Sequence, residues 1–244
     1  MIVKYRTEKG ISVPSVTMEQ MMEIDRVTIE ETGPNLYQMM ENAGRNLCML
    51  TIDALGNNWQ KVNIVVLAGT GGNGGGGICA ARHLANRGAN VKVCVTDLEK
   101  LKEVPAYQLH ILKATNAKII SIDELQNENP DLIIDAIIGY SLSGEPSGKS
   151  LELIKWASQK LGIKISLDIP SGVNSTSGEV ACNHIKADLT LTLALPKTGL
   201  VTALTGELYL ADIGIPSKVY EQLKLIYKQP FNHKNYVKLI REIQ

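Results

Sequence analysis

Three apolar segments of the sequence end in, or contain, polar side chains that can do chemistry. Asn73 follows the first segment, and Asp135 lies within the second. Asp168 and Ser171 follow the third. A carboxylate inside an apolar strand is costly unless it meets a cation or several hydrogen-bond donors. Asn, Asp and Ser offer hard oxygen ligands without nitrogen or sulfur, which suits an alkali or alkaline-earth ion better than zinc. Asp168 remains as the candidate for proton transfer.

The first segment runs into a glycine-rich sequence, Gly69–Gly77. Residues 64–68 are apolar and rich in β-branched side chains, which is typical of a strand buried on both faces of a parallel sheet. Residues 78–84 have helical spacing. A strand, a glycine turn and a helix together make a phosphate cradle, because glycines permit close approach and the first helix amides point at an anion. A flexible loop without a ligand is the alternative, and its position between a core strand and a core helix favours the cradle.

Each acid taken alone has a structural explanation as a turn or capping residue. The segment after Asp135, residues 139–148, is rich in residues that can surround a polar ligand, and Asp168 precedes a turn at Pro170. If the strands are parallel, all of these strand ends meet at one edge of the sheet. Their convergence favours a site over three separate turns.

The alternation of strands and helices predicts an α/β fold. We expect a Rossmann-like, doubly wound and mostly parallel sheet with helices on both faces, preceded by two N-terminal helices. No linker or repeat divides the chain, so a single domain is expected over residues 1–244. The predicted strands are 63–68, 91–95, 117–120, 132–137, 163–168, 188–193 and 207–210. The predicted helices between and after them are 74–87, 104–115, 148–161 and 217–226, with a short terminal helix around 236–240.

The N-terminal helices form an arm at about residues 15–56. Thr17 with Gln20, and Asn35 with Gln38, have the spacing of helix-opening caps. Such an arm can cover a sheet edge, lie over a ligand or mediate dimerisation, and the sequence leaves these three roles open. Asp25 falls on the apolar stripe of the first helix, and we interpret it as a structural carboxylate bonded to a neighbouring backbone.

Composition excludes several classes of function. Formal net charge is zero and lysines and arginines are not clustered, so no nucleic-acid partner is expected. Four separated cysteines predict reduced thiols, and no apolar run reaches membrane-spanning length, so we expect a cytoplasmic protein without a membrane partner. A nucleophile-elbow motif and a Walker A lysine are missing, and a dehydrogenase fingerprint fits poorly. The histidines, interpreted as structural or exposed, are His83, His110, His184 and His233.

Six ordered segments resemble the YjeF N-terminal domain family, the NAD(P)H-hydrate epimerases, over essentially the whole chain. The matching segments are Met40–Gly44, the glycine loop with Ala80–Leu84, Asp135–Gly139, Asp168–Gly172, Ala187–Thr190 leading to Pro196–Leu200, and Asp212–Pro216. The resemblance implies an enzyme that interconverts the R and S forms of hydrated NADH and NADPH at the hydroxylated nicotinamide carbon. This is a repair step whose functional partner is a separate NAD(P)HX dehydratase.

The resemblance also implies the roles of particular residues. A potassium ion is the implied cofactor, with Asn73, Asp135 and Ser171 as its ligands. Asp168 is implied as the catalytic acid/base or the carboxylate that orients the substrate. Family resemblance further suggests a homodimer built partly through the N-terminal helices. The implied substrate-binding residues are Gly72, Asn73, Gly74, Gly75, Gly76, Gly139, Tyr140, Ser141, Leu142, Ser143, Gly144, Glu145 and Asp168.

The glycine loop departs from the family sequence G-P-G-N-N-G-G-D-G at two polar positions. Gly72 stands where the first Asn is expected, and Gly76 stands where the Asp is expected. An alternative hypothesis is therefore a catalytically impaired member that binds a nucleotide or serves as a dimeric scaffold. A different nucleotide-dependent enzyme on the same scaffold is a third hypothesis. Turnover of a single epimer distinguishes the enzyme from the binding module.

Overall fold

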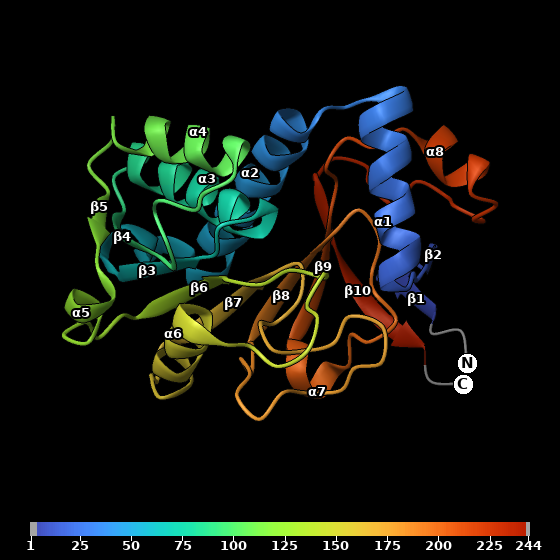
Figure 1. The fold of residues 1–244 in the computed structure, drawn as a ribbon. Coiled ribbons are helices and arrows are strands. Elements are labelled where there is room, and N and C mark those ends of the chain that lie inside the picture. Colours follow the sequence, from blue (N-terminus) through green and yellow to red (C-terminus); the bar gives the residue numbers. More distant parts are fainter. Residues whose placement is uncertain (1–3, 243–244) are drawn as a thin grey trace.

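A ten-stranded sheet forms the centre of the molecule in the computed structural model, which describes residues 4–242 (Figure 1). The strand order is β2-β1-β10-β9-β8-β7-β6-β3-β4-β5. The segment from β9 to β5 is parallel throughout, whereas β10, β1 and β2 add to it antiparallel. The strands are β1 (Lys4–Thr7), β2 (Ser12–Pro14), β3 (Asn63–Ala68), β4 (Asn90–Val95), β5 (Lys118–Ile120), β6 (Leu132–Ala136), β7 (Ile163–Leu167), β8 (Leu189–Leu193), β9 (Glu207–Ala211) and β10 (Tyr236–Glu242).

Helices cover both faces of the sheet, which confirms the predicted α/β fold (Figure 1). In β3, Ile64 and Val66 belong to the core shared with α2 and α3, whereas Val65 and Leu67 belong to a second core shared with α6. This alternation follows from the two-residue period of a strand. The helices are α1 (Met18–Val27), η1 (Thr28–Thr32), α2 (Leu36–Leu55), η2 (Gly56–Lys61), α3 (Gly72–Asn86), α4 (Glu103–Leu112), α5 (Ile122–Leu125), α6 (Gly148–Ser158), α7 (Thr202–Thr205) and α8 (Ser217–Gln222).

The predicted parallel strands all occur, but the short terminal helix expected around 236–240 is wrong. Residues 236–242 form β10, which pairs with β9 on one side and with β1 on the other. The segment alternates only weakly, and its buried side chains are Tyr236 and Leu239. Its strand conformation depends on pairing with the opposite end of the chain, and local periodicity carries no signal of that pairing.

Helix α3 begins at Gly72, so most of the glycine-rich sequence lies inside the helix rather than in a loop before it. A Cβ on Gly75 would lie 2.2 Å from Met40 Sδ, and a Cβ on Gly77 would lie 2.5 Å from Ala136 Cβ. The glycines therefore let α3 approach both α2 and the sheet closely, at a cost in helix propensity that the packing offsets. Gly69 and Gly74 have a different role, because a Cβ on Gly74 would meet the Gly69 carbonyl oxygen at 1.9 Å in the tight turn itself.

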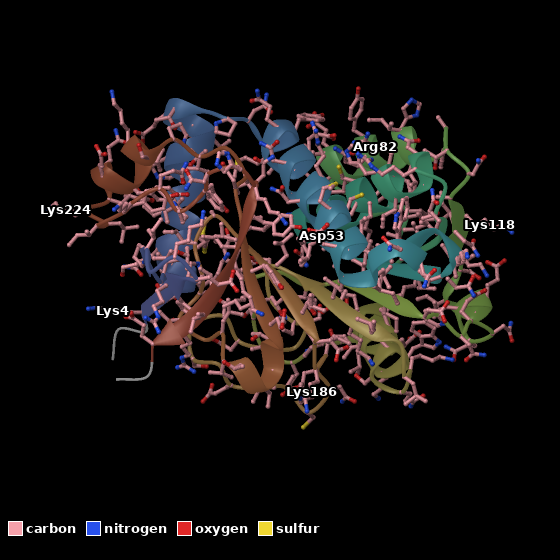
Figure 2. The ribbon with its side chains drawn as sticks, turned by 180° about the vertical axis from the view of Figure 1, so that it is seen from behind. Lys4, Asp53, Arg82, Lys118, Lys186 and Lys224 are labelled. Atoms are coloured by element: carbon pink, nitrogen blue, oxygen red, sulfur yellow. The ribbon has the colours of Figure 1, made fainter. Side chains whose placement is uncertain are left out.

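Both N-terminal helices open as the sequence predicts. The Thr17 side chain accepts a hydrogen bond from the Gln20 amide, and Asn35 does the same for Gln38, each as a complete capping box. Between residues 4 and 242, no helix has the length and hydropathy that crossing a bilayer requires. The labelled lysines Lys4, Lys118, Lys186 and Lys224 lie at separate parts of the outline in Figure 2, as expected for dispersed basic residues.

Candidate functional site

A cavity of about 450 Å³ lies at the carboxyl edge of the parallel strands. Its walls are the turn after β3, the loop after β6, the end of β7 and the N-terminal helices α1 and α2. This is the edge where open α/β sheets bind ligands, and the volume is within the range of small-molecule sites. Of the three roles left open for the N-terminal arm, the structure places its helices over this cavity.

Asp135 is completely buried at the end of β6 and is surrounded by hydrogen-bond donors. Its Oδ1 accepts from Ser171 Oγ at 2.6 Å, and its Oδ2 accepts from Ser166 Oγ and the Ser171 amide, each at 2.8 Å. Burial raises the pKa of Asp135 in spite of these bonds. The Asp135 carboxylate thus meets several hydrogen-bond donors. A carboxylate inside an apolar strand was expected to meet either such donors or a cation.

Asn73 is half-buried, but the nitrogen and oxygen of its side-chain amide are buried and unpaired. Neither Nδ2 nor Oδ1 has a hydrogen-bond partner among residues 4–242. The side chain packs against the loop after β6, where a Cβ on Gly139 would lie 3.3 Å from Asn73 Cβ. Ser171 Oγ accepts from the Ile138 amide of the same loop at 3.0 Å. Asn73 and Ser171 therefore both lie against the loop that follows Asp135, and the unpaired amide of Asn73 is suited to binding a ligand.

Asp168 directly follows β7 and has a left-handed backbone, φ 67°, a conformation that Asp tolerates better than most residues. This turn directs its carboxylate into the cavity. Oδ1 accepts from the Leu193 amide at 3.2 Å, and Oδ2 accepts from the Tyr140 amide at 3.2 Å. The side chain is therefore held from two strand ends while it lines the cavity.

Lys197 is a site residue that the sequence reasoning missed. Its side chain is only 1% exposed, and Nζ donates to Asp168 Oδ1 at 2.5 Å and to the Leu193 carbonyl at 2.9 Å. Nζ also lies 5.5 Å from the centre of the Tyr140 ring. The ammonium stabilises the charge of the Asp168 carboxylate. The available signal was a lysine at the end of an apolar run, Leu189–Pro196.

The interpretation of Asp25 as a structural carboxylate bonded to a neighbouring backbone is wrong, because its partner is a side chain. It lines the cavity from α1, and its Oδ2 accepts a hydrogen bond of 2.5 Å from the Tyr140 hydroxyl. Its position on the apolar stripe of α1 was visible in the sequence, but its partner lies 115 residues away.

The substrate-binding residues implied by resemblance divide into two sets. Gly72, Asn73, Gly139, Tyr140, Ser141 and Asp168 line the cavity. Gly74, Gly75 and Gly76 are buried within α3 and face its packing contacts, and Leu142, Ser143, Gly144 and Glu145 continue the loop beyond the lining. For both sets, contact with the substrate remains a prediction.

Gly76 stands where the family sequence has an Asp, and its surroundings show what a side chain at this position would contact. A Cβ at Gly76 would lie 2.7 Å from Leu167 Cδ2, whereas a Cβ at Gly72 would have no neighbour within 4 Å. We expect Gly76→Asp to lower stability by about 1–3 kcal/mol, because it overpacks the core and buries a carboxylate. Thermal unfolding measures this effect, and Gly72→Asn is the matched control with little change. Equal melting temperatures for the two variants would contradict the packing role of Gly76.

A second cluster of polar side chains joins α2 to α3 outside the cavity. Ligand atoms of Glu41, Cys79 and His83 lie within 4.8 Å of one another. Arg82 Nη2 donates to Glu41 at 2.5 Å and to Cys79 Sγ at 3.3 Å, so a guanidinium already occupies the space between them. His83 Nε2 lies 2.8 Å from Glu41 Oε1, in agreement with its interpretation as structural.

Known proteins resemble this chain in sequence and in structure. The family described as YjeF-related protein N-terminus matches residues 36–199. An NAD(P)H-hydrate epimerase of Dehalogenimonas lykanthroporepellens is 48% identical over 95% of both chains. A bifunctional NAD(P)H-hydrate repair enzyme of Salinibacter ruber is 32% identical over 88% of this chain but only 43% of its own length. The crystal structure of the yeast protein ynu0 has a TM-score of 0.80 at 22% identity and covers 93% of this chain and all (100%) of its own.

Proposed function

The chain belongs to the family of YjeF-related protein N-termini, and we propose that it is an epimerase that interconverts the R and S forms of hydrated NADH and NADPH. The observation that carries this proposal is the 48% identity, over 95% of both chains, to a relative named NAD(P)H-hydrate epimerase. Relatives from Rhodopirellula baltica and Nitrosopumilus maritimus carry the same name at 31% and 36% identity. The reaction repairs a damaged nicotinamide nucleotide.

The cavity offers suitable chemistry in two parts of its wall. The turn at Gly69–Gly71 precedes the N-terminus of α3, and Lys102 lies beside it, so amides and an ammonium can bind the phosphates of a dinucleotide. Asp168 and Lys197 lie at the strand ends that form another part of the same wall. The hydroxylated nicotinamide ring then lies against Asp168, whose carboxylate takes the proton of the water that attacks the ring carbon.

A potassium ion fits the oxygen cluster around Asp135. The donors there are carboxylate, amide and hydroxyl oxygens, and the Asn73 amide is buried without a partner among the described residues. Such donors match a hard cation. Asn73, Asp135 and Ser171 would hold the ion, which would supply positive charge at the carboxyl edge of the sheet and fix the loop after β6.

Potassium binding predicts a change in stability as well as in rate. We expect the melting temperature to rise by several degrees when potassium replaces tetramethylammonium, because a ligand that binds only the folded state stabilises it. Asn73→Ala removes one oxygen ligand of the ion and should abolish most of this increase in melting temperature. Asn90→Ala is the matched control, since Asn90 bonds to Asn63 at the opposite edge of the sheet. An identical potassium response in both variants would place the ion elsewhere.

The repair function implies a partner enzyme. The bifunctional relatives, such as those from Salinibacter ruber and Moorella thermoacetica, are named as repair enzymes, and this chain spans 43% of the length of each. We infer that the remaining repair step, a dehydration of one epimer, is performed by a dehydratase. A cytoplasmic homodimer with contacts through the N-terminal helices belongs to the same proposal.

Epimer interconversion tests the function directly. Purified protein in potassium buffer is mixed with a single NADHX epimer, and chromatography follows the appearance of the other epimer above the uncatalysed rate. We expect the protein to equilibrate the two forms. A folded protein that binds the nucleotide without turnover would instead support the impaired, nucleotide-binding alternative that Gly72 and Gly76 suggested.

A further inference from the structure

A tyrosine and a carboxylate form a second acid–base pair in the cavity, apart from Asp168. The Tyr140 hydroxyl lies 2.5 Å from Asp25 Oδ2, and both side chains line the cavity wall. Tyr140 comes from the loop after β6, whereas Asp25 comes from α1 of the N-terminal arm. A short hydrogen bond between two ionisable groups is suited to moving a proton.

The backbone of Tyr140 separates this pair from Asp168. The Tyr140 amide donates to Asp168 Oδ2 at 3.2 Å, so the carboxylate binds the backbone end of the residue while its hydroxyl is at the far end of the side chain. Lys197 Nζ, beside Asp168, lies 5.5 Å from the centre of the Tyr140 ring. The cavity therefore presents two groups that can exchange protons, the Asp168 carboxylate and the Tyr140 hydroxyl. They are separated by about the length of one tyrosine side chain.

Epimerisation of a carbon that carries a hydroxyl needs two such groups. The hydroxyl must leave one face of the carbon with an added proton, and water must arrive on the other face and lose a proton. Asp168 can accept the second proton, and a separate group is then needed on the other face to donate the first.

We propose that the Tyr140 hydroxyl donates the proton to the departing hydroxyl of the substrate, with Asp25 as the positioning residue that exchanges the proton with Tyr140. This proposal rests on the proposed epimerase function.

The carbon–oxygen bond breaks as Tyr140 protonates the oxygen, which leaves as water, and the ring nitrogen supplies the electron pair that forms a carbon–nitrogen double bond. Protonated Asp25 then returns a proton to Tyr140. Water forms the new carbon–oxygen bond on the opposite face, the electron pair returns to nitrogen, and Asp168 takes the proton. Before the next turnover, Asp168 releases this proton to solvent and Asp25 takes one up from solvent.

The surroundings of Asp25 favour the protonated form that this step requires. Burial raises the pKa of Asp25, and the charge of Asp168 acts in the same direction, whereas the Tyr140 hydrogen bond and the Lys197 ammonium oppose it. Tyr220 of α8 also faces Asp25. Because protonated Asp25 is the active form in this direction, the rate should fall as pH rises through its pKa.

Two conservative variants test the proposal by the interconversion of a single NADHX epimer. We expect Tyr140→Phe to lower kcat at least 100-fold with KM changed less than fivefold, since the ring and its packing remain. Asp25→Asn should lower kcat 10-fold or more and remove the alkaline fall in the rate. The double variant should be no more than threefold slower than Tyr140→Phe, because the two residues act as one unit.

The chain contains a matched control pair of the same chemistry. The hydroxyl of Tyr236, in β10, donates to Asp53, near the end of α2, and neither residue lines the cavity. Tyr236→Phe and Asp53→Asn should leave kcat and the pH profile unchanged.

The outcomes separate this proposal from the proposed function. An active wild-type protein whose Tyr140→Phe variant keeps kcat within threefold overturns the role of Tyr140 alone. An unchanged pH profile in Asp25→Asn, with only a lower melting temperature, reduces Asp25 to a structural role and overturns the pair. An inactive wild-type protein overturns the epimerase function together with the proposal. If Tyr140→Phe does not fold, the pH profile of Asp25→Asn decides.

Discussion

Replacing Asp168 by asparagine is expected to lower the rate of epimer interconversion by about 10²–10⁴-fold. The substitution conserves shape, and the asparagine oxygen can still accept from one of the two amides that hold Asp168, that of Leu193 or that of Tyr140. It removes the group that takes the proton from the attacking water. Chromatography of a single NADHX epimer in potassium buffer measures the loss.

The control for Asp168→Asn lies at the other edge of the sheet. Asp131 Oδ2 accepts from the Asn63 amide at 2.7 Å near the beginning of β3, far from the strand ends that form the cavity. Asp131→Asn should keep the wild-type rate. A rate for Asp168→Asn within tenfold of wild type would show that this carboxylate orients the substrate at most and does not transfer the proton.

The second large effect is expected from Lys197→Met, which should lower both stability and activity. Lys197 and Asp168 form an ion pair with exposures of 1% and 4%, so loss of the ammonium leaves a buried carboxylate without its counterion. Breaking such a pair from one side costs about 3–5 kcal/mol. For a protein of this size that corresponds to a decrease of roughly 10 °C in melting temperature.

A double variant separates the two consequences of losing Lys197. Lys197→Met combined with Asp168→Asn removes both charges, so we expect it to recover most of the stability and none of the activity. Lys118→Met, at an exposed lysine of β5, is the control and should change neither. A double variant as unstable as Lys197→Met alone would show that the lysine stabilises the fold by packing rather than by charge.

The predicted parallel strands agree with the structure because each is a short apolar run with its own local signal. The strand predicted at 63–68 is β3, Asn63–Ala68, and neighbouring runs behave in the same way. Helix starts were also visible where capping side chains mark them, as at Thr17 and Asn35. Helix ends were less accurate: α8 ends at Gln222, four residues before the predicted end.

The glycine-rich sequence shows the limit of local reasoning. Its composition predicted a loop that approaches a ligand, and the turn at Gly69–Gly71 does line the cavity. The following glycines belong to α3, where they bring it against Met40, Leu167 and Ala136. Glycine permits close approach of any neighbour, and the sequence does not say whether that neighbour is a ligand or another helix.

By itself, the sequence determined the α/β architecture, the family resemblance and the edge of the sheet at which Asn73, Asp135, Asp168 and Ser171 lie. Strand-end placement follows from topology, so local patterns were sufficient for it. Only the tertiary structure decided which side chains are partners.

The pairs Lys197–Asp168 and Asp25–Tyr140 join residues 29 and 115 positions apart. The pairing of β10 with β1 joins the two ends of the chain. Such contacts depend on how the elements pack in space, and packing is a property of the whole chain that no short stretch of sequence encodes.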